Sequence, residues 1–237
     1  MDSTHEPAPP ARLRWRVHGN LDKSSYFEVG RALAKNIQDL CATEGREFSS
    51  FANILDFGSG CGRVIQNFKN QSGQRRLYAT DIDPDLVSWG KSNLHGIEWS
   101  LNGYWPPMLF EDNSFDLIYG ISVFTHLDED FQHAWLRELQ RIARPGAILI
   151  LTVHGEHVIR GLQMPDSSLL DTFEERGFVF LPLSSGRFKA DGFPDFYQTS
   201  FHTKKYICNE WSAYFEILNY AERGITDHQD AVVLQKR

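Results

Sequence analysis

Apolar positions in the middle of the chain follow two spacings in turn. Nearly continuous apolar runs predict strands, and apolar residues three or four positions apart predict helices between them. The clearest helix covers 128–142, with Phe131, Trp135 and Leu139 on one side, and the Arg-Pro-Gly sequence at 144–146 ends it. The five predicted strands are 53–56, 77–82, 97–101, 115–120 and 147–153. This alternation predicts an α/β fold, a doubly wound and mostly parallel sheet with helices on both faces.

The flanking segments lack this regular alternation. Helical spacing through Phe27, Leu33 and Ile37 predicts an N-terminal helix, which either covers the first strand or caps the ligand mouth. After His154 the pattern becomes irregular as far as residue 200. The closing elements are a strand at 177–181, a helix at 203–214 and strands at 215–220 and 231–235. The short separation of the last two strands suits an antiparallel, hairpin-like pair.

Composition and charge exclude several classes of protein. The net charge of −7 argues against a general nucleic-acid binder, which needs clustered Lys and Arg. No apolar run reaches the ~20 residues of a membrane span, and the proline-containing N-terminus lacks the apolar core of a signal peptide. Cys41, Cys61 and Cys208 are scattered and show no zinc spacing. We therefore expect a cytoplasmic protein with free thiols and no metal site.

The stretch 54–63, Ile-Leu-Asp-Phe-Gly-Ser-Gly-Cys-Gly-Arg, is a strand followed by a glycine-rich turn. Glycine lets the backbone adopt positive φ and brings main-chain N–H groups close to a ligand. A helix predicted from Val64 would point its positive end at the same place. Asp81 follows the next strand at the distance expected for a nucleotide-binding βαβ unit.

The details of this turn favour a cationic ligand over a dinucleotide. The dinucleotide fingerprint, counted from Gly58, needs its third glycine at the position of Arg63, whereas here it is Gly62. Asp56 precedes the turn, and a carboxylate there is unfavourable beside a pyrophosphate. It is favourable beside S-adenosylmethionine, which carries an ammonium and a sulfonium group.

With these features the chain resembles the class I S-adenosylmethionine-dependent methyltransferases, in particular small-molecule enzymes of the type 11/12 kind. The resemblance covers residues 50 to 155. It is carried by Leu-Asp-Phe-Gly-Ser-Gly-Cys-Gly at 55–62, Ala-Thr-Asp-Ile-Asp at 79–83, Ser-Phe-Asp-Leu-Ile at 114–118 and the segment 139–146. It implies a Rossmann-like, seven-stranded sheet with strand order 3-2-1-4-5-7-6, the seventh strand being antiparallel.

The resemblance also implies which residues hold the cofactor. The residues around the methionine part would be Asp56, Gly58, Ser59 and Gly60, with Gly62 allowing close helix packing. Asp81 would accept both ribose hydroxyls, Ile82 would pack on the adenine, and Asn102 would accept a hydrogen bond from the adenine amine. Gly120 and Ile121 would line the cleft of the methyl donor.

Methyl transfer to a hydroxyl is helped by a base, and several histidines follow strand ends. His126 follows the fourth strand and His154 the fifth, and His202 lies near Asp195 and Tyr197. Our candidates for the general base are His154, His126 and His202. For each of them a structural role, as a hydrogen-bonded residue or helix cap, stays open.

We expect one domain over 1–237. Its parts are a flexible segment at 1–23, a helix at 24–45, a cofactor-binding core at 50–155, an acceptor-site or lid insertion at 156–202, and the last helix and strand pair at 203–237. The segment 193–202 looks like a subgroup often found near polysaccharide genes, which implies a sugar or lipid-linked glycan hydroxyl. The aromatic content also fits a flat natural product.

The expected function is therefore S-adenosylmethionine-dependent methylation of a small-molecule acceptor. A cofactor-binding pseudoenzyme remains an alternative, and a nucleotide-dependent dehydrogenase or epimerase is disfavoured by Arg63. A protein or nucleic-acid acceptor is disfavoured by the acidic charge and by the absence of an Asn-Pro-Pro-Tyr-like motif after the fourth strand. A homodimer is left open.

Overall fold

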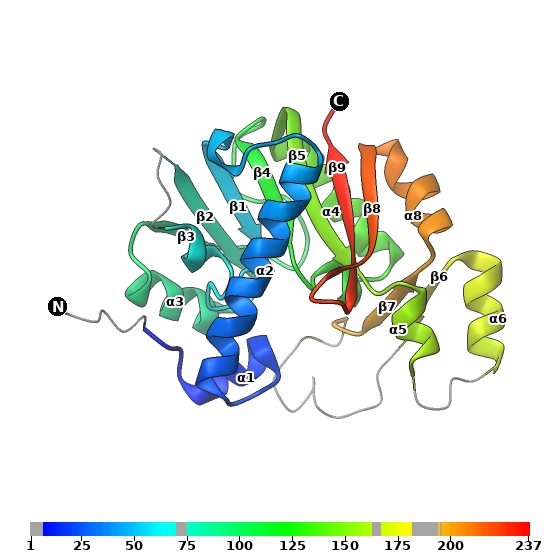
Figure 1. Ribbon diagram of the computed structural model, residues 1–237, viewed down its shortest axis with the longest axis horizontal. Coiled ribbons are helices and arrows are strands. Elements are labelled where there is room, and N and C mark those ends of the chain that lie inside the picture. The colour runs from blue at the N-terminus through cyan, green and yellow to red at the C-terminus, as the bar shows by residue number, and fades with distance from the viewer. Residues whose placement is uncertain (1–6, 70–74, 163–166, 182–193, 195) are drawn as a thin grey trace.

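The computed structural model describes residues 7–69, 75–162, 167–181, 194 and 196–237, and Figure 1 shows its layered arrangement. Seven strands form one sheet between two layers of helix. Their bounds are β1 (Asn53–Phe57), β2 (Arg76–Asp81), β3 (Ile97–Leu101), β4 (Phe115–Gly120), β5 (Ala143–Val153), β8 (Glu216–Ile225) and β9 (Gln229–Gln235). All seven strands were predicted, and β5, β8 and β9 are longer than expected.

The strand order confirms the expected topology. The sheet runs β3-β2-β1-β4-β5-β9-β8, so that the last strand of the chain lies between β5 and β8. Strand β1 is parallel to both β2 and β4, whereas β9 is antiparallel to β5. The order reverses between β1 and β4, and ligands of open α/β sheets bind in the crevice outside such a reversal.

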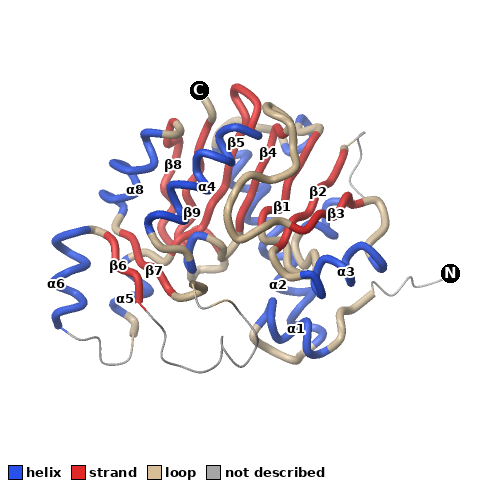
Figure 2. The backbone as a smooth tube through the Cα atoms, turned by 180° about the vertical axis from the view of Figure 1, so that it is seen from behind, coloured by secondary structure: helices blue, strands red, loops and turns tan. Residues whose placement is uncertain are grey.

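The alternation of side chains along the strands separates two apolar cores. Ile54 of β1 belongs to the core under one helical layer, and the next residue, Leu55, belongs to the core under the other. Figures 1 and 2 show these layers from opposite sides. The first layer holds α2 (Lys23–Thr43) and α3 (Pro84–Asn93), and the second holds α4 (Glu129–Ile142) and α8 (Lys204–Glu210). Because the central strands, such as β1 and β4, are buried on both faces, their sequences are nearly continuous apolar runs.

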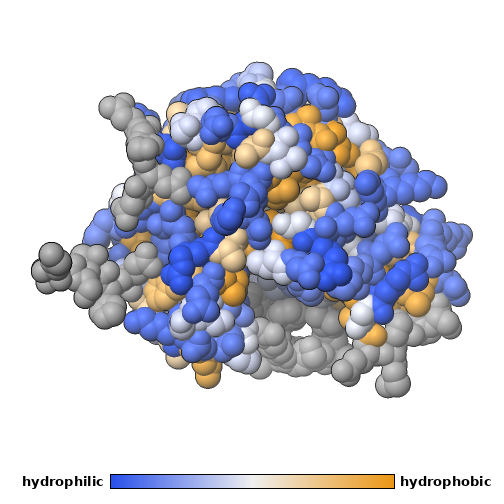
Figure 3. Space-filling view, viewed as in Figure 1, coloured by the Kyte–Doolittle hydropathy of each residue, from blue (hydrophilic) through white to orange (hydrophobic). Residues whose placement is uncertain are grey.

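Side-chain caps fix where the helices beside the sheet begin. Asp22 accepts a hydrogen bond from the Ser25 N–H at the start of α2, and Asp83 does the same for Asp85 in α3. The outer side of the α2 layer is mostly hydrophilic in Figure 3. The amphipathic pattern that predicted α2 therefore corresponds to one buried and one solvent-facing side.

A second, two-stranded sheet lies beyond β5 and β8 (Figure 1). It pairs β6 (Phe178–Leu181) with β7 (Thr199–His202), and it is accompanied by α5 (Glu156–Arg160) and α6 (Ser167–Arg176). The His202 N–H donates to the His154 carbonyl at 2.8 Å, which ties β7 to the end of β5. The sequence predicted β6 here but not its partner or the two short helices.

The N-terminal segment is more ordered than we expected. Within the segment expected to be flexible, α1 (Ala11–His18) is a helix. Leu13 packs with Cys61 and Leu86, and Arg16 forms an ion pair with Asp83. These contacts with the distant βα loops stabilise a helix that is too short to be stable alone.

The prediction of an α-helix from Val64 is wrong. The glycine turn continues into further turns and a short 3₁₀ helix, η2 (Ile65–Phe68). The Asn67 side-chain amide donates to the carbonyls of Arg63 (3.0 Å) and Val64 (2.9 Å), groups that an α-helix would pair with later N–H groups. The helix dipole expected at the ligand is therefore missing from the described part of this segment.

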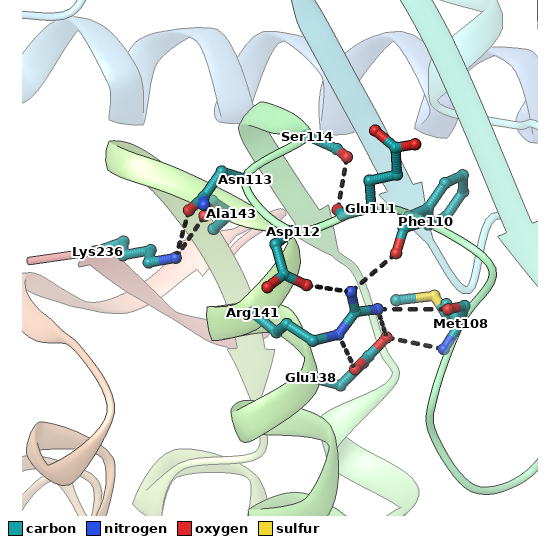
Figure 4. A network of polar contacts seen from close by, with 10 residues as sticks. All are labelled: Met108, Phe110, Glu111, Asp112, Asn113, Ser114, Glu138, Arg141, Ala143 and Lys236. Carbon is teal, nitrogen blue, oxygen red and sulfur yellow. Dashed lines mark hydrogen bonds and ion pairs between the residues drawn. The ribbon is translucent and has the colours of Figure 1, made fainter.

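A polar network ties the loop after β3 to α4 (Figure 4). Arg141 donates to the Phe110 carbonyl at 2.8 Å and contacts Glu138 at 2.6 Å. Glu138 also accepts the Met108 N–H at 2.7 Å, and its side chain is only 5% exposed. The network therefore fixes the position of the loop after β3, which also carries the aromatic residues that follow Asn102.

We expect Arg141→Met to lower the free energy of unfolding by about 2–3 kcal/mol, because it leaves the Glu138 carboxylate buried without a counter-charge. Urea unfolding measures this loss. As a control, Arg144→Met removes a more exposed ion pair with Asp116 and should cost about 1 kcal/mol or less. Equal losses in the two variants would contradict the prediction.

Candidate active site

A pocket lies where the carboxyl ends of β1, β2, β3 and β4 meet. Its lining includes α1, the glycine turn, the residues after β2, β3 and β4, one residue of α4, and the segment before β7. Of the cofactor residues predicted from the sequence, those that line it are Asp56, Gly58, Ser59, Gly60, Asp81, Ile82, Asn102 and Ile121. The fold thus brings together residues from four separate strand ends.

Gly62 and Gly120 lie behind this pocket. A Cβ at Gly62 would come within 2.7 Å of the Leu94 side chain and 2.9 Å of Trp99. At Gly120 the nearest atoms are in Leu151 and Phe57, at 3.2 and 3.4 Å. The structure therefore places these two glycines in the packing that supports the loop.

The two pocket-lining glycines need the conformation that only glycine adopts easily. Gly58 has φ 76° and Gly60 has φ 57°. A Cβ at Gly58 would lie 2.4 Å from Val123, and one at Gly60 would lie 2.7 Å from Val17. The loop therefore passes closely between α1 and the segment after β4.

Asp81 holds the glycine loop from the end of the neighbouring strand. One of its carboxylate oxygens accepts the Gly60 N–H at 2.8 Å, and the other accepts the Asp83 N–H at 2.9 Å. Burial raises the pKa of Asp81 to about 6, and the hydrogen bonds from Asp83 and Gly60 oppose this rise. Since each carboxylate oxygen has two acceptor sites, both can accept a further bond from a ligand.

Several buried polar atoms of the pocket lining lack a hydrogen-bond partner among the described residues. They include the side-chain oxygens Asp56 Oδ2, Ser59 Oγ and Asn102 Oδ1. The Asn102 Nδ2 donates a hydrogen bond to the Gly103 carbonyl at 2.9 Å, which leaves Asn102 Oδ1 for another donor. Buried polar groups in native proteins are normally paired, so these atoms fit a ligand that carries N–H or O–H donors.

Burial also changes the proton affinity of Asp56. The side chain is 2% exposed, and burial raises its pKa to about 7, with the Tyr119 hydroxyl acting in the opposite direction. Arg63, whose own pKa is lowered by burial, is another nearby charge. A cationic ligand would favour the ionised form of Asp56.

The histidine candidates differ in their surroundings. His126 is partly exposed, its Nδ1 lies 2.6 Å from the Gln198 carbonyl, and its ring stacks at 4.1 Å on Tyr197, which lines the pocket. Burial, and then the charges of His126 and His228, lowers the pKa of His154 to about 3. The His154 ring centre lies 6.2 Å from that of His126.

His202 lies in the core between β7 and α4. It is fully buried, and its Nε2 contacts the amide of Gln132 at 2.9 Å. Burial lowers its pKa to about 3. Asp195, which the sequence placed near it, lies outside the described residues.

Comparison with known proteins relates part of the chain to methyltransferases. Residues 54–146 match the family model of a methyltransferase domain. In three dimensions the chain is similar to an S-adenosylmethionine-dependent methyltransferase from Mesorhizobium loti, with 14% identity, a TM-score of 0.61, and coverage of 84% of this chain and 97% of that one. The chain therefore shares the fold of that enzyme, and its residues 54–146 are similar to a methyltransferase domain.

Two further proteins are similar to the chain. A Pyrococcus horikoshii protein has 15% identity and a TM-score of 0.62 over 87% of this chain and 91% of that one. O-methyltransferase 3 from Dictyostelium discoideum is 26% identical over 136 residues, which are 54% of this chain and 30% of that protein. The chain thus matches under a third of the length of this curated relative.

Sequence reasoning missed the part of the pocket that α1 supplies. Arg16 and Val17 line the pocket, and Arg12 contacts Asp85 at 2.7 Å. The available signal is the spacing of Leu13 and Val17, four residues apart, which places both on one face of a helix. We expected that stretch to belong to a flexible segment.

Within the described ranges, no group of three or more His, Cys, Asp or Glu side chains could hold a metal ion. No helix in that part of the chain is long and apolar enough to cross a membrane.

Proposed function

We propose that this protein transfers a methyl group from S-adenosylmethionine to a hydroxyl oxygen of a small molecule. The observation that carries the proposal is the set of acceptor atoms on Asp56, Asp81 and Asn102 around one glycine loop. The name of the Dictyostelium relative, an O-methyltransferase, supports oxygen as the acceptor atom.

Each of these side chains suits one part of the cofactor. Asp81, with acceptor sites left on both oxygens, would bind the ribose hydroxyls, and Ile82 beside it would pack on the adenine. Asn102 Oδ1 would accept the adenine amine. Asp56, Gly58, Ser59 and Gly60 would surround the methionine part, where a carboxylate complements the cationic groups.

The chemistry that S-adenosylmethionine supplies is a methyl group bonded to a positively charged sulfur. The chain's main contribution would be to hold the acceptor oxygen in line with that bond, since alignment can supply about 7–11 kcal/mol of a barrier. The segment after β4, including Ile121 and Val123, lines the pocket where this alignment takes place.

Among the candidate histidines, we propose His126 as the general base. A carbonyl oxygen only accepts hydrogen bonds, so the contact with Gln198 assigns the proton of the neutral ring to Nδ1 and leaves Nε2 as the basic nitrogen. His154, with its low pKa, would be a weak base near neutral pH. We assign His202, buried against Gln132, a structural role.

The test is formation of S-adenosylhomocysteine in the presence of a panel of hydroxyl acceptors. Turnover with a hydroxyl acceptor supports the proposal. Tight binding of S-adenosylmethionine without turnover of any acceptor would instead support a cofactor-binding pseudoenzyme. A thermal shift with NAD but not with S-adenosylmethionine would overturn both readings.

Cofactor affinity should also depend on pH. Asp56 titrates in the free protein at about pH 7 and Asp81 at about pH 6, and a cationic ligand with hydroxyl donors favours both carboxylates in their ionised form. Binding therefore releases protons, and we expect affinity to fall by up to about tenfold per unit between pH 7 and pH 6, and more steeply below pH 6, where Asp81 is also protonated in the free protein.

Calorimetry between pH 8 and pH 5.5, in buffers of different ionisation enthalpy, measures both the affinity and the released protons. Asp56→Asn should flatten the upper part of this dependence and leave the part that comes from Asp81. An affinity that stays constant between pH 8 and pH 6 would contradict the expectation.

A further inference from the structure

The charged side chains of the pocket gather at one of its ends. Those that line it are Arg16, Asp56, Arg63, Asp81 and Asp83, and all of them come from α1, from the carboxyl ends of β1 and β2, or from the loops that follow these strands. The described lining residues that follow β3 and β4, belong to α4 or precede β7 are all uncharged. The pocket is therefore divided into a charged half, which suits the methionine and ribose parts of the cofactor, and an uncharged half, which includes Asn102, the residue proposed for the adenine amine.

The uncharged half carries an aromatic wall, which we define as Tyr104, Trp135, Phe196 and Tyr197. Stacking on neighbouring aromatic rings holds the aromatic wall in place. Phe196 stacks on Phe131 at 4.6 Å, and the Phe131 ring stacks in turn on Trp105 at 4.1 Å. These contacts join the segment before β7 to α4 and to the loop after β3.

One member of the aromatic wall, Tyr104, is exposed, and another, Tyr197, lies next to the proposed base. Tyr104 packs against Phe196 with ring centres 5.0 Å apart and is nevertheless 50% exposed. Tyr197 stacks on His126, whose ring is tilted from it by only 19°. An exposed aromatic ring in a pocket is typical of a surface that binds a ligand.

We propose that the methyl acceptor is an uncharged, planar aromatic molecule with a hydroxyl group on its ring. This rests on the proposed function. The ring would lie against the aromatic wall, where offset or edge-to-face contacts between rings are favourable. The hydroxyl oxygen would form the new bond to the methyl carbon, the carbon–sulfur bond would break with its electrons on sulfur, and the hydroxyl proton would pass to His126.

The same lining disfavours two other classes of acceptor. An anionic acceptor would lose hydration in the uncharged half without gaining a counter-charge from the described residues that line it. A sugar would bring several hydroxyl groups, each of which needs a partner when buried. Among the described residues that line this half, those with a side-chain hydroxyl are Tyr104, Ser122 and Tyr197, and Ser122 is already bonded to Gln229 at 3.1 Å.

The test uses the full chain saturated with S-adenosylhomocysteine and three probes: 2-naphthol, 2-naphthoate and methyl α-D-glucopyranoside. We expect 2-naphthol to bind at least about tenfold more tightly than the other two. Tyr104→Leu and Phe196→Leu keep an apolar side chain but remove the ring, and each should weaken 2-naphthol binding about fivefold. Leu109→Ala, on the same loop as Tyr104 but 97% exposed, should leave it unchanged.

Cofactor binding is measured separately in every variant, so that the two proposals can fail independently. Equal or tighter binding of the glucoside or the naphthoate, or no effect of the two ring-removing variants, would overturn the aromatic acceptor while cofactor binding remains intact. Failure of the unaltered chain to bind S-adenosylmethionine would overturn the proposed function itself.

Discussion

Asp81→Asn is expected to weaken S-adenosylmethionine binding about 100-fold. The Asp81 carboxylate accepts the N–H groups of Gly60 and Asp83 and has acceptor sites left for two ribose hydroxyls. An asparagine has one acceptor oxygen, and its NH₂ group would face one of the two N–H donors. Losing charge-assisted hydrogen bonds and leaving a donor unpaired costs about 3 kcal/mol in all, which corresponds to about 100-fold in affinity.

Calorimetry with S-adenosylmethionine and with S-adenosylhomocysteine measures this loss. Both ligands should be affected equally, because they share the ribose. Glu98→Gln, which neutralises an exposed carboxylate on the adjacent β3, is the matched control and should change affinity less than twofold. An Asp81→Asn variant that binds within threefold of the unaltered chain would remove Asp81 from the proposed site.

The central strands of the sheet could be predicted because they are buried on both faces, as in residues 115–120, which form a strand with the bounds that we expected. Residues 97–101, at the edge of the sheet, also form a strand with the expected bounds, although Glu98 and Leu101 are exposed. The helix α1 offers only the four-residue spacing of Leu13 and Val17 as a local signal, and the 3₁₀ helix η2 could not be predicted in this way. Their conformations depend on the ion pair between Arg16 and Asp83 and on the amide of Asn67, which are contacts that local periodicity does not contain.

The candidate site likewise combines residues that a local sequence motif identifies with residues that only the fold brings together. The glycine turn and Asp81 stand out because a sequence motif keeps them at fixed spacing. The aromatic wall has no such motif, since its members follow β3, belong to α4 or precede β7. Only the topology of the sheet brings Tyr104 and Phe196 within 5.0 Å of each other.

His126→Asn is expected to lower kcat about 100-fold at neutral pH, the lower end of what a general base contributes. The asparagine Nδ2 can stand near the place of the histidine Nδ1 and keep the hydrogen bond to the Gln198 carbonyl. The substitution therefore removes the basic nitrogen with little change in the position of the segment before β7. Cofactor affinity, measured by calorimetry, should change less than threefold.

The pH profile separates a lost base from a structural defect. If the acceptor is a phenol, its hydroxyl ionises by itself near pH 10, so the rate of the His126→Asn variant should recover as the pH rises. His154→Gln is the matched control, because His154 lies beside His126 but holds a low pKa, and its kcat should stay within threefold. Loss of activity in His154→Gln alone would reverse the assignment, since the basic group would then lie at the end of β5 rather than after β4.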